Sequence, residues 1–219
     1  MIKGLFIIFM TLMSFPISAQ HLDSDLLHIK ERLDSVSSFS AKLELDLEVP
    51  FINMPTKNAT IKYQKGKDLI FSSTDFVMLP KRGLDFSLTE IFKYAFITVD
   101  RGMDTKNGLA VKVLNIIPDD ERSSLAMATL YLDTKNKRLV ASNMITKKDG
   151  SFELEMEYGD LKDIFPSDVI VEFAVEKLSI PLNFMGSDTE IDRKQMRKSD
   201  TKTGKILMAF DDYEIIKEK

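Results

Sequence analysis

The sequence contains no cysteine and no tryptophan, and it has only two histidines. The absence of cysteine excludes disulfides, although the chain begins with an apparent export signal. The two histidines, His21 and His28, are not at the i, i+4 spacing that places two metal ligands on one helix face. This composition favours binding over catalysis, and we expect no enzyme activity, no metal and no cofactor.

Catalytic motifs are also missing from the sequence. There is no Gly-x-Ser-x-Gly, no phosphate-binding loop and no dinucleotide fingerprint. The acidic run at 119–121 lacks the spaced oxygen ligands of a calcium loop. Glu153, Glu155 and Glu157 share the solvent face of a predicted strand, so they are not a hydrolytic pair across a cleft. The net charge of −4 argues against nucleic acid as a partner.

Residues 1–19 have the features of a secretory signal peptide. Lys3 precedes an apolar run at Leu5–Met13, and small residues end at Ala19. A short N-terminal membrane anchor is the alternative, but this run is shorter than the ~20 residues of a spanning helix. No cysteine follows it, so we do not expect a lipoprotein. We expect cleavage near Ala19, export to the periplasm, and one mature domain at 20–219.

The mature chain is predicted to begin with an amphipathic helix that leads directly into a strand. Asp23 or Ser24 is a suitable N-cap for this helix. From 39 to 49 the odd positions are apolar, and from 40 to 48 the even ones are polar, which predicts a sheet with one apolar face. The apolar positions of the helix are Leu22, Leu26, Ile29, Leu33 and Val36.

Further strands with short turns predict a mainly β (α+β) fold with an antiparallel sheet of about nine strands. One face of this sheet is apolar and the other is charged, so we expect it to curl around two short helices, a ligand, or both. The additional strands are predicted at Thr60–Lys65, Leu69–Thr74, Leu109–Ile117, Leu125–Asp133, Arg138–Lys147, Ser151–Tyr158, Asp168–Glu176 and Lys205–Ile215.

Two other segments are distinctive. Ser87 and Glu90 form a capping box at the start of a short amphipathic helix predicted at 87–96. Residues 178–204 are too long and too polar for a turn, and segments of this kind are either solvated insertions or functional flaps. The flap alternative has an apolar start that covers a cavity and a basic end that meets an acidic partner or a membrane surface.

The order of these elements resembles the LolA-like superfamily, which comprises the periplasmic outer-membrane lipoprotein carriers and their relatives. The similarity lies in the helix–strand junction at Leu33–Ala41, the hairpin at Ile61–Lys67, and the runs Asp149-Gly150 and Phe165-Pro166-Ser167. It covers most of the mature chain and suggests a divergent member. The resemblance implies an unclosed antiparallel half-barrel whose helices plug or cover a hollow that takes acyl chains.

The resemblance implies a passive carrier of lipid or lipoprotein acyl chains, with a membrane-bound donor or acceptor protein as a further partner. The alternative is a non-catalytic envelope sensor or interaction module on the same fold, and we expect a monomer in either case. Arg193, Lys194, Arg197 and Lys198 would contact the partner or membrane. The residues expected to line the hollow, for which plain core packing is the alternative, are Phe39, Leu43, Leu45, Leu47, Ile61, Tyr63, Phe71, Ile91, Phe92 and Phe96.

Overall fold

The structure is a computed structural model that describes residues 22–67, 69–73, 88–160, 163–176, 188–198 and 200–218. The predicted signal peptide lies outside these residues. The elements, in chain order, are α1 (Ser24–Asp34), β1 (Val36–Glu48), β2 (Ile52–Asn53), β3 (Lys57–Gln64), β4 (Ile70–Ser72), α2 (Thr89–Phe92), β5 (Phe96–Lys106), β6 (Leu109–Pro118), β7 (Leu125–Asp133), β8 (Arg138–Thr146), β9 (Ser151–Glu157), β10 (Asp168–Val175), β11 (Glu190–Ile191), α3 (Arg193–Lys198) and β12 (Lys202–Lys217).

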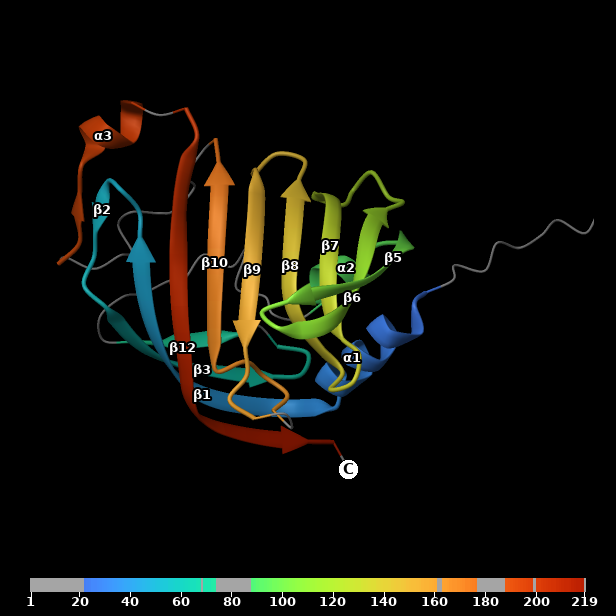
Figure 1. The fold of residues 1–219 in the computed structure, drawn as a ribbon. Coiled ribbons are helices and arrows are strands. Elements are labelled where there is room, and N and C mark those ends of the chain that lie inside the picture. Colours follow the sequence, from blue (N-terminus) through green and yellow to red (C-terminus); the bar gives the residue numbers. More distant parts are fainter. Residues whose placement is uncertain are drawn as a thin grey trace, which may run out of the picture.

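Ten strands form one antiparallel sheet in the order β4-β3-β1-β12-β10-β9-β8-β7-β6-β5, and β2 and β11 pair separately. The sheet is curved and its two edge strands do not meet, while α1 and α2 lie behind it in the view of Figure 1. The predicted class, a mainly β antiparallel half-barrel with an N-terminal helix, is therefore confirmed. Neighbours in the sheet are also neighbours in sequence from β5 to β10, whereas β1 and β12 bring together distant parts of the chain.

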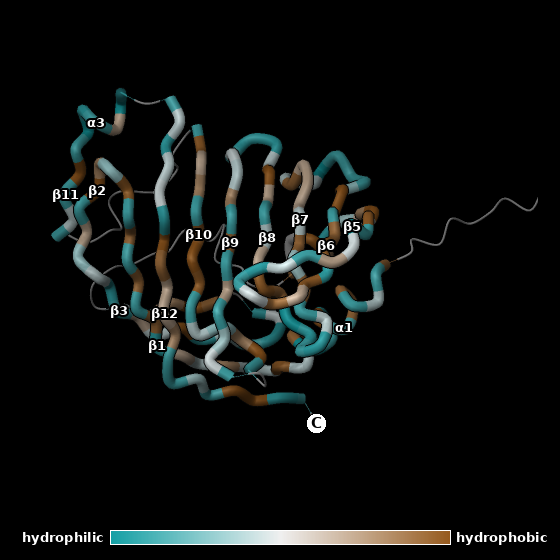
Figure 2. The backbone as a smooth tube through the Cα atoms, viewed as in Figure 1, coloured by the Kyte–Doolittle hydropathy of each residue, from teal (hydrophilic) through white to brown (hydrophobic). Residues whose placement is uncertain are grey.

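Strand β1 has the predicted one-sided pattern. Ala41, Leu43 and Leu45 are buried, and Lys42 and Glu44 between them are exposed. The buried face also carries the core against which α1 packs, and we call it the inner face; the opposite, polar face is the outer face. The same alternation recurs in the central strands, where hydrophobic and hydrophilic residues follow one another along the backbone (Figure 2).

Helix α1 forms because its apolar stripe is buried and its first turn is capped. Leu26 and Ile29 are 0% and 1% exposed. The side chain of Asp23 accepts hydrogen bonds from the amides of Asp25 and Leu26, which confirms the predicted N-cap. The helix ends at Asp34, however, and Val36 begins β1 rather than closing the helical stripe.

The structure adds to or alters the sequence-based description in three segments. The helix expected at 87–96 is only the four residues of α2, and Phe96 instead begins β5. Strand β5 itself was not predicted, because most of its side chains are exposed and it has no regular apolar alternation. Residues 188–204 contain β11, α3 and the start of β12, whereas 178–187 and Ser87 lie outside the described residues.

Candidate functional site

The structure brings nearly all of the residues predicted to line the hollow into one apolar cluster on the inner face. Tyr63 is the remaining one, and its ring lies 5.4 Å from that of Phe39. The buried members of the cluster are Leu43, Leu45, Ile61, Ile91 and Phe96, and the partly buried ones are Phe39, Leu47, Phe71 and Phe92.

The inner face is closely packed where α1 covers it. A cavity of about 10 Å³ lies there, lined by residues that include Ile29, Leu139 and Met156. Such a space holds no more than about one water molecule. In this conformation α1 itself fills this part of the inner face. A ligand would therefore bind elsewhere on the inner face, after an element other than α1 has moved.

Helix α1 is fastened to the sheet at its N-terminal end by Lys112 of β6. The Lys112 Nζ donates to Asp23 at 2.7 Å and to Asp25 at 2.8 Å. Burial alone would raise the pKa of Asp23, but the hydrogen bond from Lys112 and those from two backbone amides outweigh it, so this pKa lies below its ordinary value. The same two carboxylates raise the pKa of Lys112 against the effect of its own burial.

Arg32 fastens the C-terminal end of α1. Its guanidinium donates to the backbone carbonyls of Asn136 at 2.5 Å and Asp163 at 2.8 Å. Burial, with a smaller contribution from nearby Arg138, lowers the pKa of Arg32. Both ends of α1 thus hold charge-assisted hydrogen bonds to the sheet or its loops, which makes α1 a fixed plug.

The described contacts of helix α2 are mainly apolar. It has one turn, and its N-cap residue Leu88 makes no capping hydrogen bond through its side chain. Ile91 is buried, while Phe92 is only partly buried and packs edge-on against Phe96 with ring centroids 5.3 Å apart. The Lys30 Nζ lies 5.3 Å from the centre of the Phe92 ring, a cation–π contact with α1.

Phe39 and Tyr63 belong to an aromatic cluster at one corner of the sheet. The ring of Phe39 lies 4.5 Å from that of Phe165, which stacks on Tyr213 at 5.8 Å. The Tyr213 hydroxyl donates to the carbonyl of Pro166, and burial raises the pKa of Tyr213. This cluster ties β1 and β12 to the β9–β10 connection, so packing is the immediate role of these two predicted site residues.

Lys57 is an inner-face residue that the sequence analysis did not identify. It is 1% exposed, and its Nζ donates to both carboxylate oxygens of Asp188 at 2.5 and 2.6 Å. The predicted strand began at Thr60, three residues too late. If the apolar–polar alternation of this strand is extended towards the N-terminus, through Ala59 to Lys57, it places a lysine on the apolar face.

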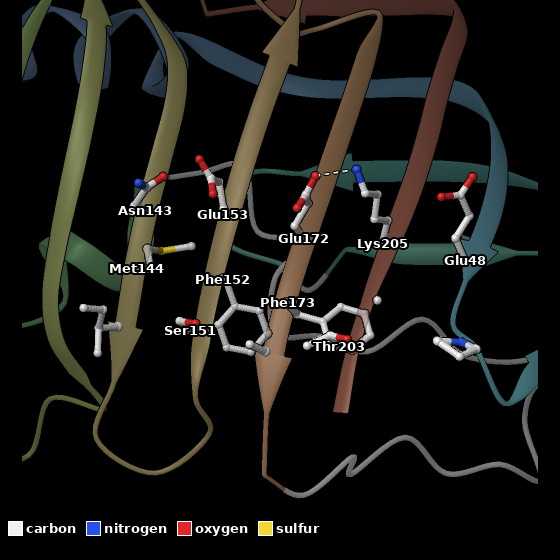
Figure 3. Close-up of a pocket in the computed structure, with 14 residues that line it drawn as sticks. Glu48, Asn143, Met144, Ser151, Phe152, Glu153, Glu172, Phe173, Thr203 and Lys205 are labelled. Atoms are coloured by element: carbon white, nitrogen blue, oxygen red, sulfur yellow. Dashed lines mark ion pairs between the residues drawn. The ribbon is translucent and has the colours of Figure 1, made fainter. Parts of the chain in front are cut away.

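The outer face carries a depression of about 640 Å³ across β8, β9, β10, β12 and β1 (Figure 3). A row of polar side chains crosses it, one from each strand, and Lys205 pairs with Glu172 at 2.6 Å. Cross-strand pairs of this kind stabilise a sheet on its solvated side. The row consists of Asn143, Glu153, Glu172, Lys205 and Glu48.

The four predicted contact cations all lie on α3. Arg193, Lys194, Arg197 and Lys198 are exposed, whereas Met196 is partly buried and packs against the core. Within the described part of the chain, none of the four forms an ion pair. Helix α3 therefore presents a compact basic surface on a short amphipathic turn.

No family model and no curated protein matches the sequence, but several solved structures match the fold. One is described as an outer membrane lipoprotein-sorting protein domain from Vibrio parahaemolyticus, with a TM-score of 0.50, 14% identity, and coverage of 87% of this chain and 91% of that one. A DUF1329 family protein from Desulfovibrio piger has a TM-score of 0.50, 10% identity, and coverage of 88% and 92%. The chain has the LolA-like fold.

A LolA superfamily protein from Nitrosomonas europaea is also similar, with a TM-score of 0.47, 10% identity, and coverage of 89% and 94%. The two structures with a TM-score of 0.50 confirm the resemblance seen in the sequence for the fold alone, at a low sequence identity that fits a divergent chain. Among the described residues, no helix is long and apolar enough to cross a membrane. The same residues contain no group of three or more His, Asp or Glu side chains placed to hold a metal ion.

Proposed function

We propose that this LolA-like chain is a periplasmic carrier that binds lipid or lipoprotein acyl chains on its inner face and passes them on without catalysis. The observation that carries the proposal is the contrast between the two inner-face helices. Helix α1 is fastened at both ends by Lys112 and Arg32, while α2 is a single turn held mainly by apolar contacts. Helix α2 is therefore the element that an acyl chain displaces.

The replacement of α2 by an acyl chain on the inner face is energetically favourable. Moving α2 exposes Ile91 and part of Phe92, and an acyl chain that takes their place buries apolar surface worth ~0.8 kcal/mol per CH₂. A chain of several methylenes offsets the loss of two side-chain contacts. Release then requires a partner that favours the open form, because a passive carrier supplies no energy of its own.

The basic surface of α3 supports contact with an anionic membrane or an acidic donor or acceptor protein. Clustered Lys and Arg side chains are attracted to anionic lipid by about 1 kcal/mol each near the surface. Arg193, Lys194, Arg197 and Lys198 are solvated and have no described anionic partner that would compete. In this proposal the carrier acts as a monomer, and α3 brings it to its partner.

The test is to export the chain, purify it without detergent, and analyse an organic-solvent extract by mass spectrometry. We expect stoichiometric acyl lipid from the parent protein and its loss from a Phe92→Asp variant. Ile97→Asp is the matched control, because Ile97 is 53% exposed on the adjoining strand β5. Absence of lipid from the parent, with thermal unfolding unchanged by added fatty acid, would refute the carrier.

A non-catalytic interaction module is the second candidate. It is favoured by the packing of the inner face beneath α1, where the cavity measures only about 10 Å³. In that case the exposed cations of α3 bind a protein, and the half-barrel is a scaffold. A lipid-free parent protein that loses a binding partner when Arg193 and Arg197 are replaced by Ser would support this candidate instead.

A further inference from the structure

Lys57 is a charged residue at a position that the fold reserves for apolar side chains. On β3 the buried residues are Lys57, Ala59 and Ile61, and Lys57 pairs in register with Leu45 of β1. Its side chain is 2% exposed, so water does not solvate the ammonium. A buried ammonium is costly unless an anion accepts its hydrogen bonds, so this position requires an anionic partner.

In this structure the anion is Asp188, and the two partners differ in their exposure to solvent. Asp188 accepts from Lys57 through both oxygens at 2.5 and 2.6 Å, yet its side chain is 54% exposed. The hydrogen bond from Lys57 lowers the pKa of Asp188, which keeps it ionised. If the pair separates, the carboxylate is hydrated at once, but the ammonium remains against an apolar face.

Among the described residues, the segment that carries Asp188 is attached through a short strand pairing. Strand β11 pairs with β2 over only two residues, and the Asp192 amide donates to the carbonyl of Phe51 at 2.9 Å. Short two-stranded pairings have little stability of their own. The carboxylate of Asp188 is thus a group that another carboxylate can replace.

We propose that Lys57 is the headgroup site for a single-chain amphiphile with a carboxylate, and that Asp188 occupies this site when the ligand is absent. The inference rests on the proposed function, since it supplies the polar end of a ligand whose acyl chain lies on the inner face. The carboxylate follows from the geometry, because the ammonium already binds two oxygens of one carboxylate. The apolar tail follows from the burial of Lys57 beside Leu45 and the inner-face core.

The experiment measures binding of laurate and of dodecanol, a neutral ligand of equal chain length, by calorimetry on the exported, delipidated full chain. We expect laurate to bind at least about tenfold more tightly, as a charge-assisted hydrogen bond predicts. Asp188→Asn removes the competing anion and raises the affinity for laurate but not for dodecanol. Lys57→Met abolishes the preference, and Lys62→Met, an exposed lysine on the same strand, leaves it intact.

Each outcome decides between the two proposals. Equal binding of laurate and dodecanol by the parent overturns the headgroup site and leaves the acyl-chain carrier standing. A laurate affinity that falls in Asp188→Asn also overturns it, because Asp188 would then assist rather than compete. Failure of both ligands to bind overturns the carrier and the headgroup site together. If Lys57→Met does not fold, as judged by circular dichroism, Lys57→Gln and the Asp188→Asn result still decide the question.

Discussion

The attachment of α1 to β6 through Lys112 and Asp23 predicts a large coupling free energy between these two residues. Their side chains are 16% and 13% exposed. Exposed ion pairs contribute up to about 1 kcal/mol, and breaking a fully buried pair costs about 3–5 kcal/mol. For this partly buried pair we expect a coupling of about 1–3 kcal/mol.

The assay is a double-mutant cycle on the free energy of unfolding in urea, with Lys112→Met and Asp23→Asn. Asparagine keeps the N-cap while removing the charge, so the cycle reports the ion pair. The control cycle replaces Lys30 and Asp34, an exposed i, i+4 pair within α1, and should give about 0.3–0.5 kcal/mol. Equal couplings in the two cycles would refute the view that Lys112 holds α1 to the sheet.

The cycle should also depend on pH in a defined direction. The folded-state pKa of Asp23 lies below its ordinary value, so the stabilisation is complete above the unfolded pKa of about 3.9. It is lost as the pH falls through the lower, folded-state value. A coupling that does not weaken at any pH below the unfolded pKa of about 3.9 would contradict the assigned charge state.

Three further predictions concern single sites. Leu26→Ala should lower the free energy of unfolding by about 2–5 kcal/mol, and His28→Ala on the exposed side of α1 should change it by less than about 0.5 kcal/mol, both measured in urea; similar losses would show that α1 is not packed as described. Gly204→Ala should lower the melting temperature, because the added Cβ would lie 2.5 Å from a neighbouring methyl group, and an unchanged value would mean that β12 can shift there. The hydrogen bond from Arg122 lowers the pKa of Asp120 to about 2, so Arg122→Gln should return it towards 3.8 in an NMR titration; an unmoved pKa would exclude this pairing.

The parts of the fold that were predictable from the sequence are those whose burial follows a regular period. Leu26 and Ile29 repeat at helical spacing, and Ala41, Leu43 and Leu45 alternate as a one-sided strand requires. In both segments the apolar residues of the repeat face the same core, so the sequence pattern and the tertiary environment agree.

The parts that were missed lack such a period or depend on distant residues. Strand β5 is formed by hydrogen bonding to β6 while most of its side chains stay exposed, so no apolar pattern marks it. Lys57 breaks the apolar pattern of β3. Its burial is explained by its ion pair with Asp188, a residue far along the chain. The irregularity of β12 opposite Ser40 and Lys42, where Asp212 has a positive φ of 53°, likewise has no apolar period that would predict it.

The pairing of β1 with β12 has a consequence for biogenesis. Val36 lies opposite Lys217, so two neighbouring interior strands of the sheet join residues separated by almost the whole described chain. During synthesis β1 can pair with β3 early, but its other edge stays open until β12 has emerged. Unpaired edges of this kind recruit other strands, and long-range pairing slows folding. We therefore expect the nascent chain to depend on protection from aggregation until β12 has been synthesised, and a variant lacking β12 to be insoluble.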